Sequence, residues 1–163
     1  MFDDLNIRVG TPNDIHQLMD LAMNASKELA FVDYDPEKIL AEIWAALHQE
    51  DGIVGVIGEV GNQIEGAVLL RTGAMWYSSE KVLEEKGIFI HPDFRSSRAH
   101  RGRRLCEFSK RVADQLGIPL MIGILSNDRL EAKTRLYERQ FGKPSGMFFL
   151  YGATPGTGSV KER

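Results

Sequence analysis

Apolar positions near the start of this chain first alternate with polar ones and then recur at helical spacing. In residues 6–9 apolar and polar side chains alternate, which is typical of a short strand. Thr11 and Pro12 then form a helix start signal, and the apolar residues that follow are spaced three or four positions apart. A second start signal at residues 35–36 precedes another apolar stripe, which ends before residues 51–52. The pattern therefore predicts one strand followed by two helices.

Beyond these helices the two patterns continue to alternate. Residues 53–59 and 63–71 are apolar and β-branched and are separated by a glycine-containing turn, which predicts a hairpin. A helix face begins at Leu105 and ends near Gly117, where glycine commonly follows a helix. Shorter apolar runs predict strands at 87–91, 119–125 and 147–151, and a helix that holds Leu130 and Tyr137.

The predicted elements follow the order β-α-α-β-β-β-α-β-α-β, without an internal repeat. We therefore expect an α/β (α+β) fold with a mixed central sheet and helices on both faces. If the strands of the unit at 88–125 lie parallel in one sheet, their crossover should be right-handed. The length of 163 residues is typical of one domain, which we expect over residues 1–152. The Gly-, Thr- and Ser-rich tail at 153–163 is expected to be disordered.

Composition and charge narrow the class of protein. With 43% hydrophobic and 26% charged residues, the chain is typical of a folded soluble domain. A net charge of -3 disfavours a general nucleic-acid coat. Cys106 is the single cysteine, so no intramolecular disulfide can form, and we expect it to be a buried apolar residue. No signal peptide, membrane span or metal-ligand spacing of histidines is found, so we expect a cytosolic protein without membrane contact or metal.

Five arginines lie within ten residues, directly after the apolar run at 87–91 and at the start of the next helix. The free N–H groups of a first helical turn and the helix dipole favour a bound anion at such a place. Cations at a helix N-terminus are unfavourable unless an anion compensates, so we favour an anion site over a solvated basic surface. Phosphate contact with nucleic acid is a further alternative, which the acidic total charge disfavours. The arginines are Arg95, Arg98, Arg101, Arg103 and Arg104.

The same stretch contains a motif similar to that of a known family. Residues 95–100 are Arg-Ser-Ser-Arg-Ala-His. This resembles the signature of the GNAT superfamily of acyl-CoA N-acyltransferases, which is Gln or Arg, two residues, Gly, one residue, and Gly or Ala. Arg95 matches its first position, whereas Arg98 and His100 replace the usual small residues. The run is also close to the Arg-Gly-Ser-Arg-Ala of a phage-associated and proteobacterial branch. Element order and the helix around Tyr137 extend the resemblance over residues 6–151.

This resemblance implies the GNAT fold, in which the sheet is mostly antiparallel and the strands at 87–91 and 119–125 splay apart. It also implies acetyl-CoA as co-substrate, with no metal. Backbone N–H groups of residues 97–103 and arginine side chains would hold its pyrophosphate, and backbone groups of 89–91 its pantetheine arm. A helix cap is the alternative role of Asn127. The implied cofactor-binding residues are Phe89, Ile90, His91, Arg95, Ser96, Ser97, Arg98, Ala99, His100, Arg101, Gly102, Arg103 and Asn127.

The resemblance also implies two catalytic residues. Tyr137 would be the general acid that protonates the departing thiolate, and its alternative is a core tyrosine bonded to backbone. Glu85 would be the general base, and its alternatives are a surface carboxylate or a water relay in its place. Aromatic residues also fall in segments that border the acceptor site in this family, although most are expected in the core or at an interface. They are Phe31, Tyr34, Trp44, Trp76 and Tyr77.

The implied activity is that of an acyltransferase, an N-acetyltransferase that moves an acetyl group from acetyl-CoA to a primary amine by direct attack. The acceptor would be a small-molecule or peptide amine, and nucleic acid is not an expected partner. A homodimer is common for this fold, and residues 147–151 are a candidate edge. Two alternatives stay open: a non-catalytic acyl-CoA-binding regulatory module and, less favoured, a phosphate- or nucleic-acid-binding protein.

Overall fold

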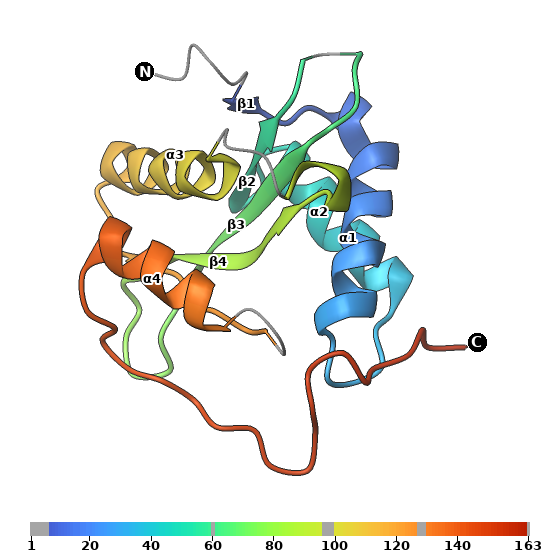
Figure 1. Cartoon of the computed structure of the whole chain (residues 1–163). Helices are drawn as coiled ribbons and strands as arrows, with labels where there is room; N and C mark the ends of the chain where they lie inside the picture. The colour runs from blue at the N-terminus through green and yellow to red at the C-terminus, as the bar shows by residue number, and fades with distance from the viewer. Residues whose placement is uncertain (1–6, 60, 96–99, 127–129, 163) are drawn as a thin grey trace.

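A five-stranded sheet lies at the centre of the computed structural model, which describes residues 7–59, 61–95, 100–126 and 130–162 (Figure 1). The strand order is β1-β2-β3-β4-β5; pairs from β1 to β4 are antiparallel, and β4 and β5 are parallel. This confirms the predicted mixed, mostly antiparallel sheet. The strands are β1 (Ile7–Val9), β2 (Gly52–Ile57), β3 (Gly66–Ala74), β4 (Lys81–Ile90) and β5 (Leu120–Met121), and the helices are α1 (Ile15–Leu29), α2 (Pro36–Leu47), α3 (Arg101–Leu116) and α4 (Leu130–Phe141).

Helices cover both faces of the sheet, as the element order predicted. Side chains of β2 alternate: Val54 and Val56 pack in a core with α1 and α2, whereas Ile57 packs in a second core with α3. Figure 1 shows α3 on one side of the sheet and α1 and α2 on the other. The sheet is therefore the middle layer between two separate apolar cores.

The contact between β2 and α3 requires a glycine at position 55. A β-carbon there would lie 2.5 Å from two ring carbons of Phe108, a side chain of α3 that is 7% exposed. The aromatic ring thus lies directly on the backbone of β2. This close packing sets the distance between the sheet and α3.

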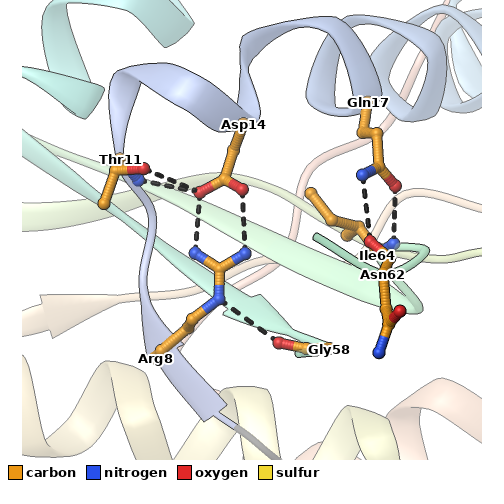
Figure 2. A network of polar contacts seen from close by, with 7 residues as sticks. All are labelled: Arg8, Thr11, Asp14, Gln17, Gly58, Asn62 and Ile64. Carbon is orange, nitrogen blue, oxygen red and sulfur yellow. Dashed lines mark hydrogen bonds and ion pairs between the residues drawn. The ribbon is translucent and has the colours of Figure 1, made fainter. Parts of the chain in front are cut away.

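A polar network joins the start of α1 to the sheet (Figure 2). The Arg8 guanidinium donates to both carboxylate oxygens of Asp14, at 2.7 and 2.8 Å, and its Nε donates to the carbonyl of Gly58 at 3.3 Å. The backbone N–H of Thr11 donates to the same carboxylate at 2.8 Å. Asp14 is only 8% exposed, so its charge is compensated by these donors.

A second part of this network joins α1 to the β2–β3 hairpin. The Gln17 side chain accepts the backbone N–H of Ile64 at 2.7 Å and donates to the carbonyl of Asn62 at 3.0 Å (Figure 2). Gln17 thus satisfies backbone groups in the hairpin turn that no strand partner reaches.

β4 contains one extra residue, Lys86. The register between β3 and β4 shifts there, because Glu85 and Gly87 face consecutive residues of β3. An inserted residue changes which positions of a strand share a face. Leu83 and Ile88, five positions apart, therefore contact the same core. The bulge directly follows Glu85, so it also sets the direction of this side chain.

β4 and β5 pair over only two positions, Leu83 with Leu120 and Glu84 with Met121. Beyond Met121 the chain leaves the sheet, while β4 continues to Ile90. This confirms the predicted splay between the two strands. The second half of β4 consequently has an edge that β5 does not cover.

The predictions for the strands at 87–91, 119–125 and 147–151 were wrong in extent or in existence. β4 begins at Lys81 and not at residue 87, because its first half is rich in charged residues that hide the strand pattern. β5 covers two residues of the predicted range 119–125. Residues 147–151 form no strand, although the run is apolar. Strand propensity reflects packing against a neighbouring strand, and none of the described strands pairs with this run.

The segment at 153–162, for which composition predicted disorder, pairs with the α1–α2 loop (residues 30–35). Tyr34 and Val160 form a parallel bridge. The N–H of Tyr34 donates to the carbonyl of Ser159 at 2.9 Å, and the N–H of Lys161 donates to the carbonyl of Tyr34 at 2.8 Å. Figure 1 shows the chain returning from α4 to this loop. Backbone hydrogen bonds hold the segment, and these do not depend on apolar composition.

Replacing Asp14 by Asn is expected to lower the free energy of unfolding by about 2 kcal/mol, because an amide cannot pair with the Arg8 guanidinium as a carboxylate does. The hydrogen bonds from Arg8 lower the pKa of Asp14. Such a carboxyl group stabilises the fold above its unfolded-state pKa, and this stability is lost as the pH falls through its folded-state pKa. Denaturant titrations at neutral and acidic pH should show that the advantage of the wild type shrinks in acid. Asp20→Asn, at an exposed position of α1, is the control; a difference that does not vary with pH would contradict the prediction.

Candidate active site

Two adjoining cavities lie along the uncovered edge of β4. The first, of about 280 Å³, lies between the end of β4, the N-terminus of α3 and α4. The second, of about 610 Å³, lies between the β4 bulge, the chain beyond β5 and the α1–α2 loop. The two cavities therefore meet, since they share five lining residues: Leu29, Ile88, Phe89, Lys133 and Tyr137.

The N-terminus of α3 closes one end of the first cavity. His100 precedes the helix in a left-handed conformation, with φ 55° and ψ 43°, where the family motif has a small residue. The carbonyl of His100 accepts the N–H of Arg104 at 3.0 Å, the first bond of the helix. The N–H groups at the start of the helix lie before that bond, so this end of the cavity favours an anion.

Gly102 lets α3 and α4 approach each other closely. A β-carbon at this position would lie 3.1 Å from the Cδ2 atom of Leu136. Leu136 precedes Tyr137 on α4, so the missing side chain at Gly102 helps to determine where Tyr137 lies.

Two arginines of the cationic run form ion pairs with distant acidic residues. Arg95 donates from both terminal nitrogens to Glu28 of α1, at 2.9 and 2.7 Å, and from Nε to the carbonyl of Ile90 at 3.0 Å. Arg101 donates to the carboxylate of Glu65. These contacts fasten the chain between β4 and α3. The guanidinium groups of Arg95 and Arg101 thus already bind carboxylates.

A third arginine of the run, Arg103, has its acidic neighbour on its own helix. Arg103 lines the first cavity and lies 3.6 Å from Glu107, one helical turn later. Five further expected contacts lie outside the described residues: Ser96, Ser97, Arg98, Ala99 and Asn127.

The backbone of β4 offers its hydrogen-bonding groups to the first cavity at different positions from those expected. The N–H of His91 donates to Glu65 at 2.9 Å and its carbonyl accepts the N–H of Phe94 at 2.9 Å, so both groups are already bonded. Backbone groups alternate between the two edges of a strand, and those of Phe89 face β3, like those of His91. The uncovered edge therefore presents the backbone groups of Ile88 and Ile90, of which the Ile90 carbonyl already accepts Arg95 Nε at 3.0 Å.

The side chain of His91 has a structural role at the end of β4. Its Nδ1 accepts the backbone N–H of Asp93 at 3.1 Å, and its Nε2 lies 3.2 Å from the side-chain nitrogen of Gln63. The histidine thus caps the turn that follows β4.

Glu85 and Tyr137 both line the second cavity and influence each other electrostatically. Burial raises the pKa of Glu85 from 4.5 to about 7, although the N–H of Gly123 and the charges of Lys133 and Lys86 act in the opposite direction. Burial and then the charge of Glu85 raise the pKa of Tyr137. The structure thus brings together the two residues that the family resemblance implied as base and acid.

The surroundings of this pair add residues that sequence analysis missed. Lys133 lines both cavities and lies one helical turn before Tyr137, a spacing that could have revealed it. Phe31 and Tyr34, which sequence analysis had named among the aromatics of segments near the acceptor site, line the second cavity. Trp76 is 94% exposed and belongs to neither cavity. Cys106 is buried, and burial raises its pKa to about 12, so it is not a ready nucleophile.

The described ranges contain neither a cluster of metal-ligating residues nor a membrane-spanning helix. No group of three or more His, Cys, Asp or Glu residues in these ranges is arranged to hold a metal ion. No helix in the same ranges is long and apolar enough to cross a membrane.

Comparison with known proteins places the fold. Neither a family sequence model nor a curated protein matches the chain. The aminoglycoside N-acetyltransferase AAC(6')-Iy, solved with a bisubstrate analogue, superposes with a TM-score of 0.69 at 13% identity, covering 90% of this chain and 96% of that one. The aminoglycoside acetyltransferase meta-AAC0020 from an uncultured soil metagenomic sample gives 0.65 at 17% identity, covering 91% and 96%. The ribosomal-protein-alanine N-acetyltransferase from Brucella melitensis biovar Abortus 2308 gives 0.65 at 14% identity, covering 90% and 97%.

These likenesses cover nearly the whole of each chain, and the shared feature is the arrangement of helices and strands. The chain has the fold of the GNAT acyl-CoA N-acyltransferases. The resemblance in residues 95–100 and around Tyr137 thus predicted the fold correctly.

Replacing Glu85 by Gln is expected to make the fold more stable than the wild type at neutral and higher pH. Because the folded-state pKa of Glu85 is raised to about 7, ionisation of this group destabilises the fold as the pH rises from 4.5 through about 7. Glutamine does not ionise, so the difference in unfolding free energy should grow with pH to about 3 kcal/mol. Denaturant titrations across this range measure it. Glu80→Gln, at an exposed position, is the control; a difference that is constant with pH would sink the prediction.

Proposed function

We propose that the protein is a cytosolic N-acetyltransferase that moves the acetyl group of acetyl-CoA to a primary amine. One observation supports this above the others: the two cavities meet at Tyr137, and Glu85 lines only the second of them. The first cavity ends at a helix N-terminus, which suits an anionic co-substrate. The second cavity then suits the amine acceptor, and Tyr137 lies at the junction between acceptor and donor.

Backbone groups support donor binding more than arginine side chains do. The N–H groups of residues 101–103 would hold the pyrophosphate, with Arg103 beside them. The backbone groups of Ile88 and the N–H of Ile90 would bond the amides of the pantetheine arm, much as an added strand bonds a sheet edge, since the Ile90 carbonyl already accepts Arg95 Nε. Ser96, Ser97, Arg98, Ala99, His100 and Asn127 complete the proposed contacts on the strength of the family resemblance.

Glu85 would act as the general base toward the acceptor. With a pKa of about 7, its carboxylate takes up protons more readily than an ordinary glutamate and is still partly ionised at neutral pH. It would accept one proton from the substrate ammonium. The lone pair of the resulting amine attacks the acetyl carbonyl carbon and forms the new carbon–nitrogen bond. The bond from that carbon to sulfur breaks, the CoA thiolate leaves with the electron pair, and the nitrogen releases its second proton to solvent. Holding both reactants in adjoining cavities supplies much of the rate by proximity.

Tyr137 would stabilise and protonate the departing thiolate. Burial and the charge of Glu85 raise its pKa, so the phenol stays neutral and able to donate a hydrogen bond. A proton moves from its hydroxyl to the sulfur and is replaced from solvent or from Glu85. The positive charge of Lys133, which lines the same junction, would stabilise the negative charge that develops there.

The names of the structural neighbours support an amine acceptor. The neighbours include aminoglycoside acetyltransferases and a ribosomal-protein-alanine N-acetyltransferase. The fold therefore serves small-molecule and protein amines alike, and this supports the acceptor class without singling out one compound.

Calorimetric titration with acetyl-CoA, followed by a thiol-release assay over a panel of amines, tests this function. Wild type should bind acetyl-CoA and release thiol only when an amine is present. Tyr137→Phe should lower kcat by about 100-fold and leave the affinity for acetyl-CoA unchanged, because it removes only the proton donor. Tyr77→Phe, at a tyrosine that is 69% exposed, is the control. Absence of heat with acetyl-CoA would overturn the function, and heat without turnover would favour the non-catalytic binding module.

We also propose that two copies of the chain associate through residues 147–151. Met147, Phe148, Phe149 and Tyr151 are exposed by 78%, 58%, 86% and 103%. The run is thus an exposed apolar segment. Such a segment on one copy can cover the same segment on another in a two-fold symmetric contact.

Light scattering tests this association. Wild type should have twice the monomer mass of 18.3 kDa, and Phe149→Ser should shift the mass to that of the monomer. Trp76→Ser, which removes an aromatic side chain of similar exposure elsewhere, should leave the dimer intact. A monomeric wild type at assay concentrations would refute the proposal.

A further inference from the structure

The C-terminal segment holds one wall of the second cavity. The α1–α2 loop supplies that wall through residues 30–34. The carbonyl of Ala30 accepts the N–H groups of Gly156 and Gly158, each at 2.9 Å. The N–H of Ser159 donates to the carboxylate of Asp33 at 3.0 Å. Together with the backbone pairing of Tyr34, these bonds span the loop from one end to the other.

Only glycine fits where the two segments lie closest. A β-carbon at Gly158 would lie 2.1 Å from the carbonyl oxygen of Val32, which is much shorter than any allowed contact between these atoms. Gly146 belongs to the same C-terminal region, but a β-carbon there would meet nothing within 4 Å. The segment therefore packs tightly against the loop at Gly158, whereas a side chain at Gly146 would meet open space. Substitutions at these two glycines therefore form a matched pair of variants.

Asp33 is the carboxylate that this contact places on the cavity wall. Its side chain accepts the Ser159 N–H and forms no ion pair with a lysine or arginine of the described residues. Glu84 also lines the cavity, but it pairs with Lys86. Apart from Glu85, which is assigned to the reacting nitrogen, Asp33 is thus the lining carboxylate that forms no ion pair among the described residues. An unpaired carboxylate at a partly enclosed site favours a cation.

The cavity is larger than one amino group requires. Its volume of about 610 Å³ falls in the usual range for sites that hold whole small molecules, about 300–1,000 Å³. An acceptor that fills it reaches beyond Glu85, where the reacting nitrogen would lie, toward the wall formed by the loop. The groups there are those of the loop itself, with Asp33 among them.

On the basis of the proposed function, we propose that the acceptor is an amine with a second positively charged group and that Asp33 binds this group. The segment at 153–162 positions Asp33 by holding the α1–α2 loop. One ammonium group loses its proton to Glu85 and reacts, while the other keeps its charge and pairs with Asp33. The segment is thus a positioning element of the acceptor site.

Spermidine titrated calorimetrically into the CoA-saturated protein tests the charge pairing, with n-butylamine as a singly charged comparison. Asp33→Asn keeps an oxygen that can accept the Ser159 N–H but removes the charge. It should weaken spermidine binding about tenfold and leave acetyl-CoA binding unchanged. Gly146→Ala should bind spermidine as the wild type does. Equal spermidine affinity in the wild type and Asp33→Asn, or butylamine binding as tight as spermidine, would overturn the assignment of Asp33.

Hydrogen exchange tests the positioning role separately from catalysis. Gly158→Val should accelerate exchange of the backbone amides in residues 30–35 and weaken spermidine binding, whereas Gly146→Ala should change neither. If Gly158→Val does not fold, a chain that ends at residue 152 replaces it in the same measurement. Unchanged exchange in the loop would refute the role of the segment. Acetyl-CoA binding without spermidine binding would refute this inference and leave the proposed function standing, whereas loss of acetyl-CoA binding itself would refute the proposed function.

Discussion

β4 and β5 share backbone hydrogen bonds over two residue pairs, and the site depends on their separation beyond that point. A strand edge inside the fold that no neighbouring strand covers needs other hydrogen-bond partners for its N–H and C=O groups. At Ile88 and Ile90 these groups face a cavity. The same separation leaves room for the second cavity on the side of the bulge. The fold thus forms a site by leaving a parallel strand pair incomplete.

The second constraint is the attachment of the chain between β4 and α3. Arg95 and Arg101 draw this connection toward Glu28 and Glu65, which belong to other parts of the fold. Charge-assisted hydrogen bonds of this kind are strong and directional. They hold the N-terminus of α3 at the end of the first cavity. Within the cationic run, Arg95 and Arg101 thus fix the chain in front of α3, and Arg103 lines the first cavity.

Burial gives the junction of the cavities its chemical character. Glu85, Tyr137 and Cys106 are all removed from water, and each has a raised pKa for that reason. For Glu85 this lowers stability at neutral pH and leaves a carboxylate that takes up protons more readily than an ordinary glutamate. For Tyr137 it keeps the phenol neutral.

Much of the fold could be predicted from local pattern. Periodicity and capping residues identified α1, α2 and α3, because an amphipathic stripe and a start signal are properties of neighbouring residues. The motif at 95–100 and the position of Tyr137 pointed to the correct fold. The length of β4 could not be predicted, since its charged first half has no clear apolar alternation. The apolar run at 147–151 looked like a strand, but a strand requires a neighbour, and propensity alone does not supply one.

The sequence by itself determined which segments become helices and where the sheet is built, because these follow from short-range patterns of apolar, capping and charged residues. Only the tertiary structure decided which groups meet. It paired Arg95 with Glu28 across 67 positions, turned Ile88 and Ile90 toward the cavity through a bulge at Lys86, and brought Ser159 to Asp33 across 126 positions. Such contacts depend on register and on the packing of distant segments, and no local pattern specifies either.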